Sequence, residues 1–201
     1  MYIICADLEG IFVPEIWINV AEKTGVEELR LTTRDIPDYD ELMKGRLEIL
    51  RRKGIGIRDI QEVIETMDPL DGAEEFLNWV RDRFQFILVS DTFVEFADPL
   101  LKKLNRPTLF CNSLVIDSGG MIVDYQLRQR DGKRHVIKAL RSLEYKVIAV
   151  GDSYNDITML NEADKGILFR PPDKISSEFN HFPAIHLYDE FKDELKSCLK
   201  N

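Results

Sequence analysis

The chain lacks several features that would assign it to a common class of protein. Its 201 residues include only 3 cysteines, an odd number that excludes a fully paired disulfide framework. Cys5, Cys111 and Cys198 share no spacing typical of a metal site, and we expect Cys5 to be a core thiol. The 3 histidines form no ligand motif either, which argues against a zinc site.

The chain also lacks an excess of positive charge and long apolar runs. Its 27 lysines and arginines are outnumbered by 36 aspartates and glutamates, which gives a formal net charge of −9. We therefore expect neither nucleic acid nor an anionic membrane surface as a partner. No apolar stretch approaches the length of a membrane span, and no secretory signal is present, so we expect a cytoplasmic protein. The apolar share of 44% is sufficient for an ordinary folded core.

The first apolar run, residues 2–6, leads directly into two acids and a glycine. A continuous apolar run of this length is typical of a strand buried on both faces of a parallel sheet. Asp7 and Glu9 would then follow the carboxyl end of that strand, where open α/β sheets bind their ligands. The alternative is a strand that simply ends in solvated acids, and the pair alone does not decide between the two.

Two later apolar runs, residues 86–89 and 147–150, also end in polar residues. Helical stretches separate the runs, so the pattern predicts an α/β fold with a doubly wound, Rossmann-like parallel sheet. The carboxyl ends of its strands would lie at one edge. The residues expected to converge there, including a lysine that opens the helix before the third run, are Asp7, Glu9, Ser90, Asp91, Lys133, Asp152, Asn155 and Asp156.

Local capping offers a purely structural explanation for two of these turns. Thr92 with Glu95, and Ser153 with Asp156, have the spacing of a capping box. The remaining elements that the pattern predicts are helices at 73–83, 133–143 and 188–199, strands at 108–111 and 166–169, and a hairpin at 114–123 with a glycine-rich turn.

A purely helical stretch separates the first strand from the rest of the α/β pattern. A first helix is predicted to begin at Pro14 and to continue through residues 16–24. Two more are predicted at 39–53, after Asp38 as N-cap, and at 57–67. We expect residues 15–69 to form a cap over the carboxyl end of the first strand. The core would then comprise residues 1–14 and 70–201.

Two charged residues of this helical stretch are candidates for binding a ligand. Arg46 interrupts the apolar stripe of its helix, which indicates either a side chain that snorkels to water or a guanidinium that grips an anion. Glu15 would lie in the first helical turn, where a negative charge is favourable without any function. We favour an anion-binding Arg46 and leave both explanations open for Glu15.

The converging residues have the chemistry needed for phosphoryl transfer. Asp7 and Asp152 offer hard oxygen ligands of the kind that Mg²⁺ prefers, with Glu9 as a further candidate ligand. Lys133 and the metal would neutralise charge on the transferring group, while Ser90 and nearby backbone N–H groups would hold its oxygens.

These motifs resemble the haloacid dehalogenase-type phosphatases. That family runs from an Asp-x-Asp after the first strand, through a Ser or Thr and a Lys, to a Gly-Asp-x-x-x-Asp turn. Asp7-Leu8-Glu9, Ser90, Lys133 and residues 151–156 match in that order. Glu15 and Arg46 match the cap positions with which phosphoserine phosphatases read their amino acid.

The first motif departs from the common pattern, because Glu9 replaces the usual second Asp and Ile11 replaces Thr or Val. With residues 13–17, this variant looks closest to the bifunctional phosphoserine phosphatases that also transfer the phosphoryl group to homoserine. The resemblance implies Asp7 as nucleophile, Glu9 as general acid and base, and Glu15, Arg46, Ser90, Asp91, Lys133 and Asn155 as substrate-binding residues.

The resemblance also implies Mg²⁺ as cofactor, O-phosphoserine as donor, and water or homoserine as acceptor, in serine and threonine biosynthesis. The sequence leaves open whether the protein forms a homodimer. Three alternatives are a phosphatase of another small ester, a signalling receiver domain and an idle binding protein of the same fold. The helical insertion and the position of Asp7 disfavour a receiver, and the complete set of polar groups disfavours an idle protein.

Overall fold

The computed structural model describes residues 1–33, 35–36 and 38–198. Within that part of the chain the strands form a seven-stranded sheet in the order β4-β3-β2-β1-β5-β6-β7. Neighbouring strands are parallel except β3 and β4, which form an antiparallel hairpin. The strands are β1 (Tyr2–Ala6), β2 (Gln85–Phe93), β3 (Leu109–Ile116), β4 (Ile122–Gln126), β5 (Lys146–Gly151), β6 (Lys165–Phe169) and β7 (Ala184–Ile185).

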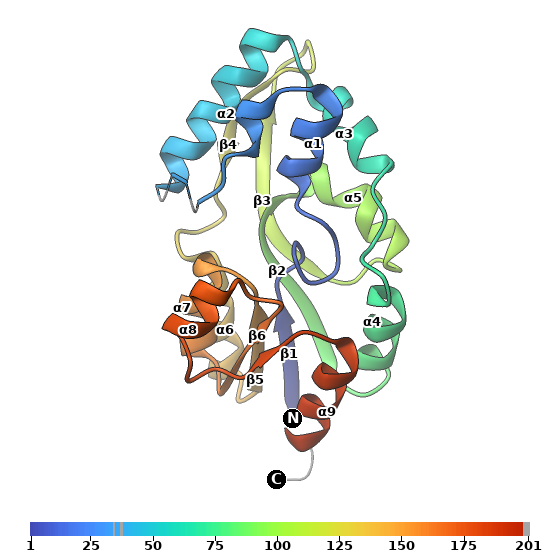
Figure 1. Ribbon diagram of the computed structural model, residues 1–201, viewed down its shortest axis with the longest axis vertical. Coiled ribbons are helices and arrows are strands. Elements are labelled where there is room, and N and C mark those ends of the chain that lie inside the picture. The colour runs from blue at the N-terminus through green and yellow to red at the C-terminus, as the bar shows by residue number, and fades with distance from the viewer. Residues whose placement is uncertain (34, 37, 199–201) are drawn as a thin grey trace.

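Helices cover both faces of this sheet (Figure 1). Together with the mostly parallel strands, this arrangement confirms the doubly wound α/β class predicted from the sequence. The α-helices are α1 (Ile16–Thr24), α2 (Tyr39–Lys53), α3 (Ile57–Glu65), α4 (Ala73–Arg81), α5 (Val94–Lys103), α6 (Gly132–Ser142), α7 (Ile157–Glu162), α8 (Asp173–Glu178) and α9 (Tyr188–Cys198), and the 3-10 helices are η1 (Glu27–Arg30) and η2 (Tyr154–Asp156). The last helix was predicted to reach Leu199, which lies outside the described residues.

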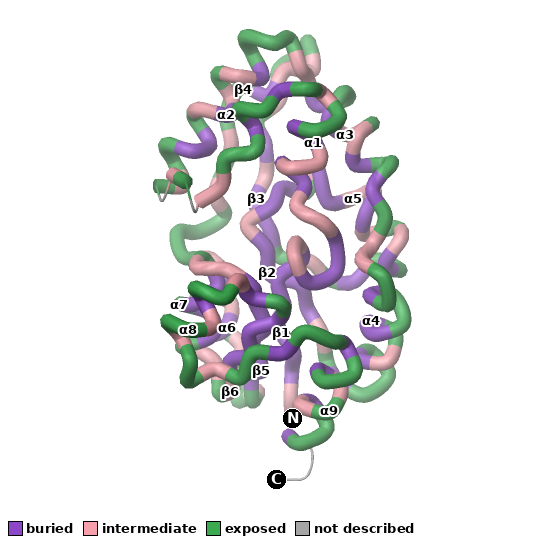
Figure 2. The backbone as a smooth tube through the Cα atoms, in the orientation of Figure 1, coloured by how far each residue is buried: buried purple, intermediate pink, exposed green. Residues whose placement is uncertain are grey.

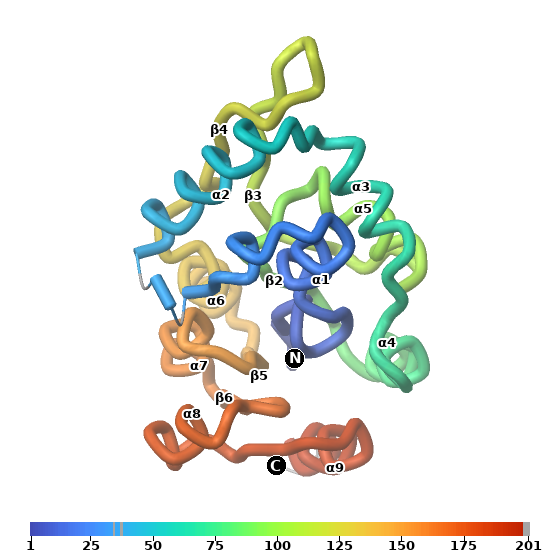
Figure 3. The backbone as a smooth tube through the Cα atoms, turned by 45° about the horizontal axis from the view of Figure 1, so that its top comes forward, coloured from blue at the N-terminus to red at the C-terminus, as the bar shows by residue number. Residues whose placement is uncertain are grey.

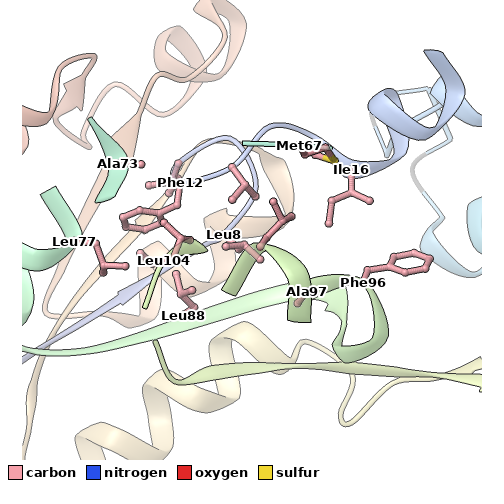
Figure 4. Packing of buried hydrophobic residues seen from close by; sticks show 14 of the residues in the cluster. Leu8, Phe12, Ile16, Met67, Ala73, Leu77, Leu88, Phe96, Ala97 and Leu104 are labelled. Carbon is pink, nitrogen blue, oxygen red and sulfur yellow. The ribbon is translucent and has the colours of Figure 1, made fainter. Parts of the chain in front are cut away.

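The core has one part on each face of the sheet because successive side chains of a strand point to opposite faces. Ile4 and Ala6 of β1 pack with residues of α4, α5 and α9, and Figure 4 shows part of this larger cluster. Ile3 and Cys5 pack with residues of α6, α7 and α8. Burial of Cys5 as a core thiol is thus confirmed, and the loss of water around it raises the pKa of the thiol.

Helices α1, α2 and α3 lie beyond the carboxyl ends of β1 and β2 (Figures 1 and 3). The caps predicted for α2 are present, since Asp38 accepts the N–H of Glu41 at 2.9 Å and Gly54 follows in the left-handed conformation. The predicted start of α1 is two residues too early. Pro14 lies outside that helix, and Glu15 is its N-cap residue rather than part of the first turn.

The β3–β4 hairpin extends alongside these helices and supports them (Figure 1). The N–H of Ile57, at the start of α3, donates to the carbonyl of Gly120 in the hairpin turn at 2.9 Å. The ring of Tyr39 at the start of α2 packs edge-to-face on Tyr125 of β4, with centroids 6.0 Å apart, and the Tyr125 hydroxyl bonds to Asp40. The helical segment therefore has contacts to the hairpin at two separate places.

One turn is built differently from its prediction. Strand β2 continues through Ser90 to Phe93 with an irregularity in its pairing to β3. The capping box of Thr92 with Glu95 is wrong, because the Glu95 carboxylate instead accepts the N–H of Leu114 on β3 at 3.0 Å.

Helices α3 and α4 each end two residues earlier than predicted, and the segments predicted at 108–111 and 114–116 form one strand. None of the described helices has both the length and the apolar composition to cross a membrane.

Candidate active site

The carboxyl ends of three adjacent parallel strands form the floor of the site. Strand β1 lies between β2 and β5, and the N–H of Asp7 continues the pairing by donating to the carbonyl of Val150 at 3.0 Å. A cavity of about 440 Å³ opens at this edge under helices α1 and α2. It is lined by Asp7, Glu9, Glu15, Arg46, Ser90, Asp91, Lys133, Asp152 and Asn155, whereas Asp156, which was also expected here, lies behind Lys133 and does not line it.

Lys133 connects two acids at the bottom of this cavity. Its Nζ donates to Oδ2 of Asp7 at 2.8 Å and to Oδ1 of Asp156 at 2.7 Å, and Oδ2 of Asp91 lies 3.6 Å away. The Lys133 side chain is only 3% exposed, and Asp156 is fully buried. Although burial favours the neutral amine, Asp156, Asp7 and Asp91 outweigh it and raise the pKa of Lys133 well above its usual value. Lys133 is therefore a fixed positive charge beside Asp7.

Asp156 organises the loop that follows β5. Its Oδ2 accepts the N–H groups of Asp152 and Ser153 at 3.0 and 3.1 Å, so the predicted pairing of Ser153 with Asp156 is present. The side chain of Asp156 lies so close to Gly151 that a Cβ on this glycine would come within 2.3 Å of it. A glycine is needed there because any larger residue would push Asp156 away from Lys133.

Asp7, Asp152 and Asp156 each offer a carboxylate oxygen within 4.8 Å of the others, so this group has the size of a metal site. Oxygen ligands of this kind suit Mg²⁺. Gly10 approaches the group closely in a left-handed conformation, and a Cβ there would lie 2.7 Å from an oxygen of Asp152. Glu9, the further predicted ligand, is not among these three residues, and its Oε2 accepts the N–H of Ile16 at 2.8 Å.

Asp7 and Asp152 have raised pKa values, chiefly because burial removes water from their charged forms. Burial brings the pKa of Asp7 to about 7 even though Lys133 opposes the rise, and it brings that of Asp152 to about 8 with Asp156 and Asp7 adding repulsion. A cation bound among these carboxylates would restore their ionised forms. The residues present thus fit a divalent metal both in geometry and in charge.

Ser90 and Asp91 end the second strand of the site. The Ser90 hydroxyl is buried and accepts the N–H of Thr92 at 3.3 Å. The Asp91 carboxylate is 37% exposed and accepts the Asn155 amide at 2.8 Å, while its carbonyl accepts the Tyr39 hydroxyl at 3.2 Å. Asn155 therefore contacts Asp91, and both side chains border the cavity.

Glu9 lies on the side of the cavity nearest the helical segment. Burial raises its pKa to about 8, with repulsion from Glu15 and Asp7 adding to the rise and the N–H of Ile16 and the charge of Arg46 opposing it. Such a carboxyl group keeps its proton near neutral pH, as a general acid requires. Glu15 lines the same cavity, and among the described residues its side chain has no hydrogen bond or ion pair.

Arg46 is buried, as its place in the apolar stripe of α2 predicted, and does not snorkel to water. Its Nη2 donates to the carbonyl of Leu31 at 2.7 Å, and Nη1 lies 3.6 Å from the Met43 sulfur. Within the described part of the chain its Nε has no hydrogen-bond partner. A buried N–H without a partner is costly, and Arg46 lines the cavity, so a ligand acceptor that reached this N–H would remove that cost.

Several residues that line the cavity had not been predicted as part of the site, among them Trp17, Tyr39 and Arg170. Trp17 packs on Arg46, Tyr39 bonds to Asp91, and Arg170 follows β6 with a positive φ of 50°. Arg170 could have been found from sequence, because it follows an apolar run that was predicted as a strand. Trp17 and Tyr39 had no such signal, since each occupies an apolar helix position typical of a core residue.

Comparisons with known proteins agree with this geometry. The model of a family of hydrolases, the haloacid dehalogenase-like hydrolases, matches residues 6–164. The chain therefore belongs to the haloacid dehalogenase-like hydrolases, and the prediction of an enzyme from that family is confirmed.

Individual relatives narrow the comparison. A protein named phosphoserine phosphatase from Pseudomonas syringae pv. tomato is 58% identical over 192 residues, which cover 96% of this chain and 81% of the relative. Phosphoserine phosphatase ThrH of Pseudomonas aeruginosa is 57% identical over 194 residues, covering 96% of this chain and 95% of that protein. A solved structure of a substrate-bound phosphoserine phosphatase complex has the same fold, with a TM-score of 0.76 at 21% identity over 98% of this chain and 97% of the other.

Proposed function

We propose that this enzyme is a phosphoserine phosphatase that works through an aspartyl phosphate on Asp7. The observation that carries the proposal is that one cavity joins two sets of groups. Asp7 with its Lys133 partner lies at one end, and the buried guanidinium of Arg46 with its unpartnered Nε lies at the other. A substrate with a phosphate and an amino-acid carboxylate matches both ends.

In the first step, an oxygen of Asp7 attacks phosphorus while the bond between phosphorus and the seryl oxygen breaks. Glu9 gives its proton to that oxygen, and L-serine leaves. In the second step, Glu9 takes a proton from the acceptor, whose oxygen attacks phosphorus and releases Asp7. The raised pKa of Glu9 supports its role as the acid of the first step. With water as acceptor, the products are serine and inorganic phosphate.

The phosphoryl group of the substrate would lie against Lys133 and Ser90. Lys133 holds the charge of Asp7 and compensates part of the negative charge that develops on the phosphoryl oxygens. Asp7 and Asp152 are the residues that would hold a Mg²⁺ ion, with Asp156 fixing both the loop and Lys133. When bound, the ion would supply further positive charge to the phosphoryl oxygens.

The amino-acid part of the substrate would lie against the helical segment. Arg46 would donate its Nε–H, and Nη1–H in place of the weak sulfur contact, to the substrate carboxylate. Glu15, which has a negative side chain in the same cavity, would attract the substrate ammonium. Asp91 and Asn155 border the cavity and would shape its rim. We propose on this basis that residues 15–69 are a cap that sets specificity over a core of residues 1–14 and 70–201.

We further propose that the enzyme transfers the phosphoryl group to homoserine. This proposal rests on the variant first motif with Glu9, and on 57% identity to the protein named phosphoserine phosphatase ThrH. Homoserine carries the same ammonium and carboxylate as serine, so Glu15 and Arg46 would serve it in turn. Helices α1 and α2 cover one side of the cavity, and the water that this cover keeps away from the phosphoryl group would favour this transfer.

A product assay tests both activities. Purified enzyme with Mg²⁺ and O-phosphoserine is expected to release serine and inorganic phosphate, and added homoserine should divert part of the phosphate to phosphohomoserine. If inorganic phosphate is the only phosphorus-containing product in the presence of homoserine, the enzyme is a phosphatase without the transferase activity. Equal activity on p-nitrophenyl phosphate and O-phosphoserine would favour another small ester as substrate.

The receiver-domain alternative does not fit a member of this hydrolase family. The metal, a biosynthetic role, a cytoplasmic location and a homodimer stay predictions.

A further inference from the structure

The guanidinium of Arg46 lies on the face of a tryptophan. Its central carbon is 4.4 Å from the ring centroid of Trp17, which comes from α1, whereas Arg46 belongs to α2. Both side chains are buried and both line the cavity. The indole is itself held from another side by Phe96 of α5, edge-to-face with centroids 5.5 Å apart. Trp17 thus bridges the helical segment, the core and the cavity.

Arg46 needs such a support because its own hydrogen bonds do not fix it. One nitrogen donates to the Leu31 carbonyl, a second has only the Met43 sulfur, and Nε has no partner among the described residues. Glu9 and Glu15 meanwhile attract the guanidinium electrostatically. An ion pair with either acid would occupy the N–H groups that the substrate carboxylate needs.

We propose that Trp17 is a positioning residue for substrate recognition, whose indole face keeps Arg46 away from Glu9 and Glu15 and ready for the substrate carboxylate. The attraction between a guanidinium and an aromatic face involves no competing negative charge, so it holds Arg46 without occupying its N–H groups. The inference rests on the proposed function, in which Arg46 binds the carboxylate of O-phosphoserine.

Steady-state kinetics of Trp17→Phe and Trp17→Leu test this role. We expect Trp17→Leu to raise KM for O-phosphoserine by roughly five- to thirtyfold, and Trp17→Phe by less, because Phe keeps a weaker aromatic face. The kcat for O-phosphoserine, and the KM and kcat for p-nitrophenyl phosphate, should stay within about threefold of the wild type. Should Trp17→Leu fail to fold, Trp17→Phe carries the same test.

The chain offers a matched control. Trp79 also stacks on an arginine, Arg83, at 4.8 Å, but neither residue lines the cavity. Trp79→Phe should therefore leave the KM values for both substrates unchanged. If Trp79→Phe raises the KM for O-phosphoserine as much as Trp17→Phe does, the effect comes from general packing and the proposal is overturned.

A double-mutant cycle shows whether Trp17 acts through Arg46. In an Arg46→Met background, Trp17→Leu should change the KM for O-phosphoserine by less than about twofold, since the partner is already absent. An undiminished effect there would overturn the positioning role, as would equal losses on p-nitrophenyl phosphate. If the wild-type enzyme does not prefer O-phosphoserine to p-nitrophenyl phosphate, the proposed function is overturned together with this inference. If the wild type has that preference and Trp17→Leu retains it, only this inference is overturned.

Discussion

At one end of the cavity the charged side chains form hydrogen bonds with one another, and at the other end they do not. Asp7, Lys133 and Asp156 form a connected network, which we call the sheet end. Arg46 and Glu15, the helical end, leave polar groups without hydrogen-bond partners in the described part of the chain. A network that is complete without a ligand contributes to folding as well as to chemistry. In the proposed function the helical end contributes mainly to binding, so substitutions at the two ends should have different effects.

The largest effect is expected for Asp7→Asn at the sheet end. The amide cannot act as the nucleophile, so turnover of O-phosphoserine and of p-nitrophenyl phosphate should both fall by a factor on the order of 10⁴ or more. Phosphate release under saturating substrate measures this loss, and trapping in acid should detect no phosphoprotein. A variant that keeps near-normal rates would exclude the covalent step.

Lys133→Met should reduce stability and turnover together. Without the ammonium, Asp7 and Asp156 are left as uncompensated buried acids, so the free energy of unfolding should fall by about 3–5 kcal/mol. Turnover should fall by roughly 10²- to 10³-fold. Urea unfolding and phosphate release measure the two losses. Lys165→Met is the matched control, because its ion pair with Glu194 is partly exposed, and it should cost about 1 kcal/mol or less.

Arg46→Ala should affect binding at the helical end and spare the sheet end. The specificity constant kcat/KM for O-phosphoserine should fall by an amount equivalent to about 2–5 kcal/mol, because a desolvated charge pair with the substrate is lost. Hydrolysis of p-nitrophenyl phosphate should change little, since that ester has no carboxylate. Arg83→Ala, which removes the surface arginine stacked on Trp79, provides the control. Equal loss on both substrates would remove the distinction between the two ends.

The smallest effect concerns pH and the metal. Asp7, Glu9 and Asp152 have folded-state pKa values of about 7, 8 and 8, above those of an unfolded chain, so the folded protein binds protons more tightly. Their contribution to stability is present at low pH and is lost as pH rises through 7 to 8. In EDTA, the free energy of unfolding should therefore fall as the pH is raised from 6 to 9. Mg²⁺ should reduce this fall, and an equal fall with and without the ion would argue against metal binding at these acids.

The parts of the fold that could be predicted are those that residues adjacent in the sequence specify. Strand β1 is a continuous apolar run, and α2 has Asp38 and Gly54 at its ends, so neither depends on distant residues. The turn after Ser90 was not predictable in this way. Glu95 matches a local capping pattern, but its carboxylate bonds to Leu114, whose position depends on how β3 pairs with β2. The short elements α7, α8 and β7 were missed because so few residues show little periodicity.

The residues of the candidate site also divide into those that the local sequence indicated and those that it did not. The acids at the sheet end were found because each follows an apolar run, and Arg46 was found because it interrupts an apolar stripe. Trp17 and Tyr39 were missed, since their importance comes from partners that only the folded chain brings near, Arg46 for one and Asp91 for the other. Local sequence therefore indicated the chemistry, whereas the support around it depends on tertiary packing.

The contact between Ile57 and Gly120 has a consequence for engineering. Because the hairpin turn and the start of α3 fit each other, exchanging residues 15–69 alone between two relatives would place new helices on an unmatched support. A Cβ at Gly56 would also lie 2.8 Å from the Gly120 carbonyl, so this join tolerates little added bulk. A chimaera that is meant to inherit the substrate preference of another family member should carry the hairpin of that same parent.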